Sequence, residues 1–71
     1  MNYYEKVANM FGVELNKKFM VQDEENGIVF KCMFTKFGLI VFEDERHWEF
    51  DHWCKILKCL LCGKMKVLKM S

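Results

Sequence analysis

Two cysteines near the end of the chain have the spacing of a metal or redox site. Cys59 and Cys62 form a Cys-x-x-Cys pattern. A zinc site needs four protein ligands, or three and a water molecule, so the pair needs partners from elsewhere. His47 and Cys32 are candidate third ligands only if the fold brings them close, whereas His52 lies roughly 10 Å away along a helix. Because no second Cys-x-x-Cys accompanies the pair, we expect no metal and no cofactor.

The same pair is also a candidate for thiol–disulfide exchange. Reactive thiols of low pKa lie at helix N-termini, where the helix dipole stabilises the thiolate. Gly63 follows Cys62 directly and is typical of the end of a helix. The dipole at that end opposes a thiolate, so we expect two reduced thiols on a helix surface or beneath a neighbouring segment.

Carboxylates and imidazoles gather in a second place, between residues 45 and 51. Glu45, His47, Glu49 and Asp51 could supply a general acid and a general base. Acidic residues ahead of a helix are also favoured by the helix dipole alone. No glycine-rich phosphate loop or nucleophile motif accompanies them. We therefore expect no enzyme activity.

The same region has a stronger interpretation as a protein-binding surface. Residues 43–51 hold five acidic residues against a single arginine. An exposed tryptophan beside an acidic cluster would be a good binding anchor, although Trp48 could instead close the end of the core. The acids could imitate nucleic-acid phosphates before a basic groove. The candidate protein-binding residues are Glu43, Asp44, Glu45, Trp48, Glu49 and Asp51.

The C-terminal part of the chain is basic, since residues 55–71 hold five lysines and no acid. Nucleic-acid binding is therefore an alternative function. Lys64 and Lys66 alternate with Lys69, so the three cannot share one strand face, and no aromatic residue lies between them to stack on bases. A lysine-guarded edge strand is the alternative interpretation.

Hydrophobic periodicity and turn residues predict the elements that must position these residues. We expect a helix over residues 2–11, with Asn2 as its cap and Glu5 completing a capping box. Strands are expected over 17–22, 28–34 and 39–42, with Asn26-Gly27 as a hairpin turn. A helix over 49–62 and a strand over 65–70 follow. This order predicts a single two-layer α+β domain (residues 1–71) of helix, three-stranded antiparallel meander, helix and strand.

The same patterns predict the core. Alternation places four residues of the second strand on one face: Ile28, Phe30, Cys32 and Phe34. At about 100° per residue, the second helix gathers an apolar stripe that faces the sheet. Its members are Phe50, Trp53, Cys54, Leu57, Leu60 and Leu61. Trp53 is therefore expected in the core, with Cys59 and Cys62 facing outward.

Length and composition set limits on location and partners. The chain has 71 residues and a net charge of +1, so its global charge indicates no partner. No secretion signal and no run of about 20 apolar residues is visible, so we expect a cytoplasmic protein that does not bind membranes. Its cysteines would be reduced there.

Three stretches of the chain resemble a group of small proteins from phages and prophages of Gram-positive bacteria. The opening residues 2–8 and 11–15 match the usual start, and Gly38-Leu39 matches a Gly-Leu pair that opens a later strand. Residues 60–64 and 67–69 are similar to a leucine-rich helix, glycine stop and closing strand. The resemblance implies a phage setting inside a bacterial host. Compact phage proteins of this size often bind a host protein, and anti-CRISPR inhibitors of CRISPR effectors are one such class.

Overall fold

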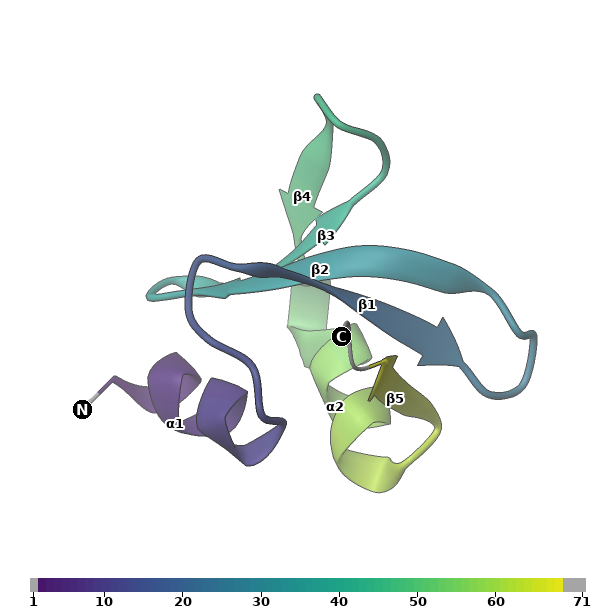
Figure 1. The fold of residues 1–71 in the computed structure, drawn as a ribbon, viewed down its shortest axis with the longest axis horizontal. Helices are drawn as coiled ribbons and strands as arrows, with labels where there is room; N and C mark the ends of the chain where they lie inside the picture. Colours follow the sequence, from purple (N-terminus) through teal and green to yellow (C-terminus); the bar gives the residue numbers. More distant parts are fainter. Residues whose placement is uncertain (1, 69–71) are drawn as a thin grey trace.

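The computed structural model describes residues 2–68, which form two α-helices and a five-stranded antiparallel sheet. The elements are α1 (Tyr3–Met10), β1 (Lys18–Asp23), β2 (Val29–Thr35), β3 (Gly38–Phe42), β4 (Trp48–Phe50), the 3-10 helix η1 (His52–Cys54), α2 (Lys55–Cys62) and β5 (Met65–Leu68). The strand order is β4-β3-β2-β1-β5. Both helices lie on the same side of the sheet (Figure 1). This is the two-layer α+β architecture that the sequence predicts.

Helix α1 begins and ends at residues that the sequence indicates. The Asn2 side-chain oxygen accepts a hydrogen bond from the Tyr4 N–H at 2.9 Å, which confirms the predicted cap. The Asn2 side-chain amide also donates to the Lys36 carbonyl at 3.3 Å and ties the helix to the β2–β3 turn. Gly12 leaves the helix with a φ of 72°, a left-handed conformation that glycine adopts without steric cost. The helix buries Val7 and Ala8 against the sheet.

The predicted meander of three strands is confirmed. Strand β1 pairs antiparallel with β2, and β2 pairs antiparallel with β3. The Asp23 carboxylate accepts a hydrogen bond from the Glu25 N–H at 2.9 Å and shapes the first turn. Strand β5 returns to pair antiparallel with β1, where Val67 lies opposite Val21. It thus forms one edge of the sheet.

The core lies between the sheet and the two helices. Phe34, Val21 and Cys32 are fully buried, and the rings of Phe19 and Phe34 stack with centroids 5.5 Å apart. Burial of a side chain of this size stabilises the fold by roughly 1.5–3 kcal/mol. Cys32 and Phe34 have the orientation that alternation predicts. Ile28 is different, because it precedes β2 and is 58% exposed.

The predicted start of the second helix is wrong. Residues 48–50 form strand β4, paired antiparallel with β3, and α2 begins only at Lys55. Trp53 and Cys54 have φ values of 60° and 53°, in the left-handed region that non-glycine residues rarely adopt. An α-helix cannot continue through two such residues. The residues before and after them therefore do not lie on one face of a single helix, as the predicted stripe requires.

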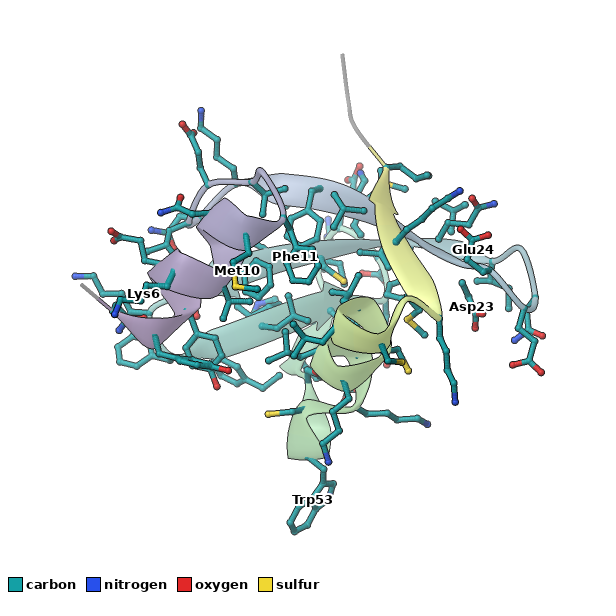
Figure 2. The ribbon with its side chains drawn as sticks, turned by 90° about the horizontal axis from the view of Figure 1, so that it is seen from below. Lys6, Met10, Phe11, Asp23, Glu24 and Trp53 are labelled. Carbon is teal, nitrogen blue, oxygen red and sulfur yellow. The ribbon has the colours of Figure 1, made fainter. Side chains whose placement is uncertain are left out.

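The three stripe residues that precede α2 therefore lie outside the core. Trp53 is 91% exposed and projects away from the ribbon (Figure 2), and Cys54 is exposed as well. Phe50 is 41% exposed on β4. The predictions for Leu57 and Leu60 are confirmed, since both are 4% exposed.

Leu61 is 51% exposed, although the sequence predicts it inside. The short helix buries a stripe centred between Leu57 and Leu60, with Ile56 packed at its margin. At about 100° per residue, Leu61 lies about 70° from the centre of that stripe, on the margin opposite Ile56. The broader stripe depended on residues 50–54 continuing α2 as an α-helix, and they do not.

Candidate functional site

The sheet has one face that the helices do not cover, here called the open face (Figure 1). Residues opposite one another on neighbouring antiparallel strands point to the same side of a sheet. The register places Met20 opposite Lys31, Lys31 opposite Phe42, and Phe42 opposite Trp48. These four side chains therefore form one row across the open face, from β1 to β4.

The β4 end of this row is aromatic and accessible to a partner. Trp48 is 51% exposed and Phe50 is 41% exposed. Their rings meet edge to face with centroids 5.5 Å apart, so the two side chains hold each other in place. Lys18 places its ammonium 4.7 Å from the centroid of the Phe42 ring, a cation–π contact beside them.

A groove of about 350 Å³ lies beside the row. Residues of β1, β2 and β3 line the groove, among them the apolar Met20 and Phe42 and the basic Lys18 and Lys31. Three acidic residues of the loop between β3 and β4 line it as well: Glu43, Asp44 and Glu45. The acidic residues predicted from the sequence thus border a groove of mixed apolar and charged lining that the sequence pattern does not indicate.

Asp44 organises the β3–β4 loop. Its Oδ1 accepts hydrogen bonds from the backbone N–H groups of Arg46 at 2.7 Å and His47 at 2.8 Å, and the His47 ring nitrogen Nδ1 lies 3.0 Å away. These contacts, the Arg46 N–H first, lower the pKa of the Asp44 carboxyl below its ordinary value. The loop is closed by the Glu43 N–H, which donates to the His47 carbonyl at 2.9 Å. Asp44 therefore stays anionic and holds its neighbours on the loop.

Four of the six predicted binding residues come together at this hairpin: Glu43, Asp44, Glu45 and Trp48. Glu49 lies opposite Val41 and so points to the helix side of β4. The Asp51 carboxylate accepts hydrogen bonds from the N–H groups of Ile56 at 2.9 Å and Leu57 at 3.0 Å. Asp51 thus caps α2 instead of facing a partner.

The acid–base set suggested by the sequence is divided between different surroundings. His47 contacts Asp44 and not Glu45. Glu49 points to the helix side of β4, and Asp51 lies at the start of α2. Phe50, Phe42 and Lys18 also belong to this surface, although they are not among the predicted binding residues. The alternation of Trp48, Glu49 and Phe50 is a strand pattern that could have indicated Phe50.

The cysteines occupy separate environments. Cys62 is exposed and Cys59 is half-buried, and the Cys62 thiol lies 3.6 Å from the Cys59 carbonyl oxygen. Cys32 lies in the core, where burial first and the Asp51 charge second raise the pKa of its thiol to about 12. Within residues 2–68, no group of three or more His, Cys, Asp or Glu side chains could hold a metal ion.

Within the basic C-terminal region, Met65–Leu68 form the edge strand β5, as one of its two interpretations predicts. Lys66 lies on β5 and its Nζ is 2.8 Å from Glu24 Oε1. This ion pair partly neutralises the positive charge that a nucleic-acid surface would use. Lys69 lies outside the described residues. Among the helices of residues 2–68, none is long and apolar enough to cross a bilayer.

The comparisons with known proteins give no further guide to the site. No protein-family model, no curated protein and no solved structure matches the chain.

Proposed function

We propose that this chain is a small interaction protein that binds a host protein through the β3–β4 hairpin. The observation that carries the proposal is the exposed pair of Trp48 and Phe50 on the uncovered face of the sheet, beside an acidic loop. The binding surface consists of Glu43, Asp44, Glu45, Trp48 and Phe50, and is here called the hairpin surface.

The aromatic half of the hairpin surface supports a role as an anchor. Tryptophan is enriched among residues that carry most of the binding energy, because it buries a large area with few rotatable bonds. Here the Phe50 ring already restricts the Trp48 ring through their edge-to-face contact. Binding would therefore cost less side-chain entropy than ordering a free tryptophan.

The acidic residues of the hairpin surface favour a partner with a positively charged surface. Glu43 and Glu45 are exposed on the loop, and Asp44 holds its charge through hydrogen bonds from the backbone. Charges at the rim of an interface raise the association rate and select partners of opposite charge. A basic groove that normally holds nucleic acid fits this chemistry, because carboxylates can take the place of phosphates.

The resemblance to phage proteins makes the proposal more specific about the kind of partner. It supports a phage-encoded inhibitor in the host cytoplasm, of the anti-CRISPR type, that occupies the nucleic-acid groove of a CRISPR effector. The test is a target-cleavage assay with the purified effector of the host. Inhibition that is lost when Glu43 and Glu45 are both changed to Lys supports this step, and undiminished cleavage at saturating protein overturns it.

The broader proposal is tested by affinity capture from lysate of the bacterial host with quantitative mass spectrometry. Trp48→Ala should reduce capture of the specific partner by about tenfold or more, since truncating an anchor typically costs over 1.4 kcal/mol of binding free energy. The double variant Glu43→Lys and Glu45→Lys should reduce capture similarly and make it less sensitive to salt.

Two control variants make this experiment specific. Trp53→Ala removes another exposed tryptophan that lies outside the hairpin surface, and Glu25→Lys reverses an exposed charge in the β1–β2 turn. Both should capture the partner as well as the wild-type protein does. A partner that binds all four variants equally would show that the hairpin surface is not the binding site, and the proposal would be wrong.

A further inference from the structure

Strand β4 has backbone groups directed out of the sheet. The Glu43 N–H donates to the His47 carbonyl at 2.9 Å, and the Asp51 N–H donates to the Leu39 carbonyl at 2.8 Å. Hydrogen-bonded and non-hydrogen-bonded pairs alternate along an antiparallel ladder, so Glu49 forms the hydrogen-bonded pair with Val41 between them. The N–H and C=O groups of Trp48 and Phe50 consequently point away from β3, along the free edge.

The two edges of the sheet differ in their protection. Strand β5 carries Lys66 and is preceded by Lys64, and charged side chains, lysine above all, discourage another strand from pairing. Strand β4 carries Trp48, Glu49 and Phe50, with neither lysine nor proline. The charge of the strand itself is the negative charge of Glu49, while Arg46 precedes the strand and Lys55 lines the same pocket as Glu49. The β4 edge therefore repels acidic strands and accepts basic ones.

We propose that the β4 edge receives an extended strand from the partner protein, in which basic residues alternate with apolar residues. This inference rests on the proposed function and specifies the chemistry of its partner. Apolar side chains of the added strand would lie on the open face beside Trp48 and Phe50. Basic side chains would lie on the other face, beside Glu49. Backbone hydrogen bonds supply affinity in this mode of recognition, and the alternating side chains supply specificity.

A second copy of this chain fits the edge less well than a basic strand does. An antiparallel β4–β4 pair that uses all three residues is centred on Glu49. It would place the two Glu49 residues directly opposite one another, with their Cβ atoms about 5 Å apart, where like charges are destabilising. The acidic loop residues Glu43 and Glu45 add to the negative charge of each copy. Charge thus favours a foreign basic strand over self-pairing.

The inference can be tested with a short peptide of defined chemistry. The probe is an acetylated and amidated peptide of seven residues that alternates valine and lysine, beginning with valine. Amide hydrogen exchange of the intact protein is followed by NMR with and without saturating peptide. We expect exchange at the N–H groups of Trp48 and Phe50 to slow by about tenfold or more, because the peptide carbonyls accept hydrogen bonds from them. Unchanged exchange at both amides overturns the inference.

Two N-methylated peptides separate backbone pairing from side-chain contact. When the peptide pairs antiparallel to β4, as we propose, the valines lie opposite Trp48 and Phe50, so their N–H groups face β4, whereas the lysine N–H groups face outward. Methylation of the valine nitrogens should weaken binding by about tenfold or more, and methylation of the lysine nitrogens should leave it unchanged. Equal binding of both methylated peptides overturns strand addition. If both methylated peptides bind the wild-type protein but not Trp48→Ala, the hairpin surface remains supported as a site that binds side chains.

A charge-reversed peptide completes the test. The peptide that alternates valine and glutamate has the same length and the same backbone donors. We expect it to leave exchange at Trp48 and Phe50 unchanged, because its carboxylates would lie beside Glu49. Equal protection by the acidic and the basic peptide would overturn the assignment of a basic partner.

Discussion

The carboxylate of Asp51 accepts a hydrogen bond from the backbone N–H of Leu57 at 3.0 Å, six residues further along the chain. Its second oxygen accepts from the Ile56 N–H at 2.9 Å. Two of the N–H groups that the first turn of α2 leaves without a helical partner are satisfied in this way. The contact also explains how α2 can begin directly after two residues in left-handed conformation.

Removal of this cap should destabilise the fold. We expect Asp51→Ala to lower the free energy of unfolding by about 0.5–2 kcal/mol, the usual cost of losing a helix cap. Urea unfolding followed by circular dichroism measures the change. Glu49→Gln is the matched control two residues earlier and should alter stability by less than about 0.5 kcal/mol. Equal stability of Asp51→Ala and the wild type would show that the cap contributes nothing.

A substitution at Trp53 distinguishes the core position predicted from the sequence from the exposed position in the structure. Trp53→Gly should leave the free energy of unfolding unchanged or raise it by up to about 1 kcal/mol, because glycine adopts a φ of 60° without strain and the exposed ring gives up no burial. Leu57→Ala, four residues on, should lower it by about 2–5 kcal/mol. A loss of more than 1 kcal/mol in Trp53→Gly would place the ring in the core.

The four cysteines should differ strongly in reactivity. We expect a thiol reagent at pH 8 to label Cys54 and Cys62 first, Cys59 more slowly, and Cys32 only after unfolding. Cys32 is fully buried and the pKa of its thiol is raised to about 12, so it presents almost no thiolate. Mass spectrometry of labelled peptides identifies each site. Cys62→Ser should lose one fast site and leave Cys32 protected, and labelling of native Cys32 as fast as Cys62 would contradict the structure.

The stability of the β3–β4 loop should depend on pH in the acidic range because of Asp44. Hydrogen bonds from Arg46 and His47 lower the pKa of its carboxyl in the folded protein. The stability linked to this group is therefore fully present above the usual aspartate pKa of about 3.9, and is lost as the pH falls through the lower folded value. An NMR titration of the Asp44 carboxyl carbon should give a midpoint below 3.9. Asp44→Ala is the control for the loop signals, and a midpoint at or above the usual value would contradict the assigned contacts.

Most of the fold could be predicted because its signals are local. The Asn2 cap depends on the Tyr4 N–H two residues away, and the Asp23 turn depends on Glu25. Alternation over residues 29–35 indicates a strand whichever strands lie beside it. In these places the residues that make the contact are neighbours in the sequence, so a pattern in the sequence contains the whole interaction.

The segment from residue 48 to 54 could not be predicted in the same way. Its apolar residues fit a helix and a short strand equally well, and pairing with β3 decides for the strand. The left-handed turn at Trp53 and Cys54 follows from the need to carry the chain from the sheet edge to α2, where the Asp51 carboxylate takes the first amides. No local preference of tryptophan or cysteine favours that conformation.

The sequence by itself determined that acidic residues and a tryptophan lie within one short stretch, and that the cysteine pair lies at a helix end. Only the tertiary structure decided that the acidic loop borders a groove lined by Met20 and Phe42, that Phe50 joins Trp48, and that Asp51 caps α2. The physical reason is that cross-strand register brings residues from β1 and β4 onto one face. That register depends on pairing between strands far apart in the chain.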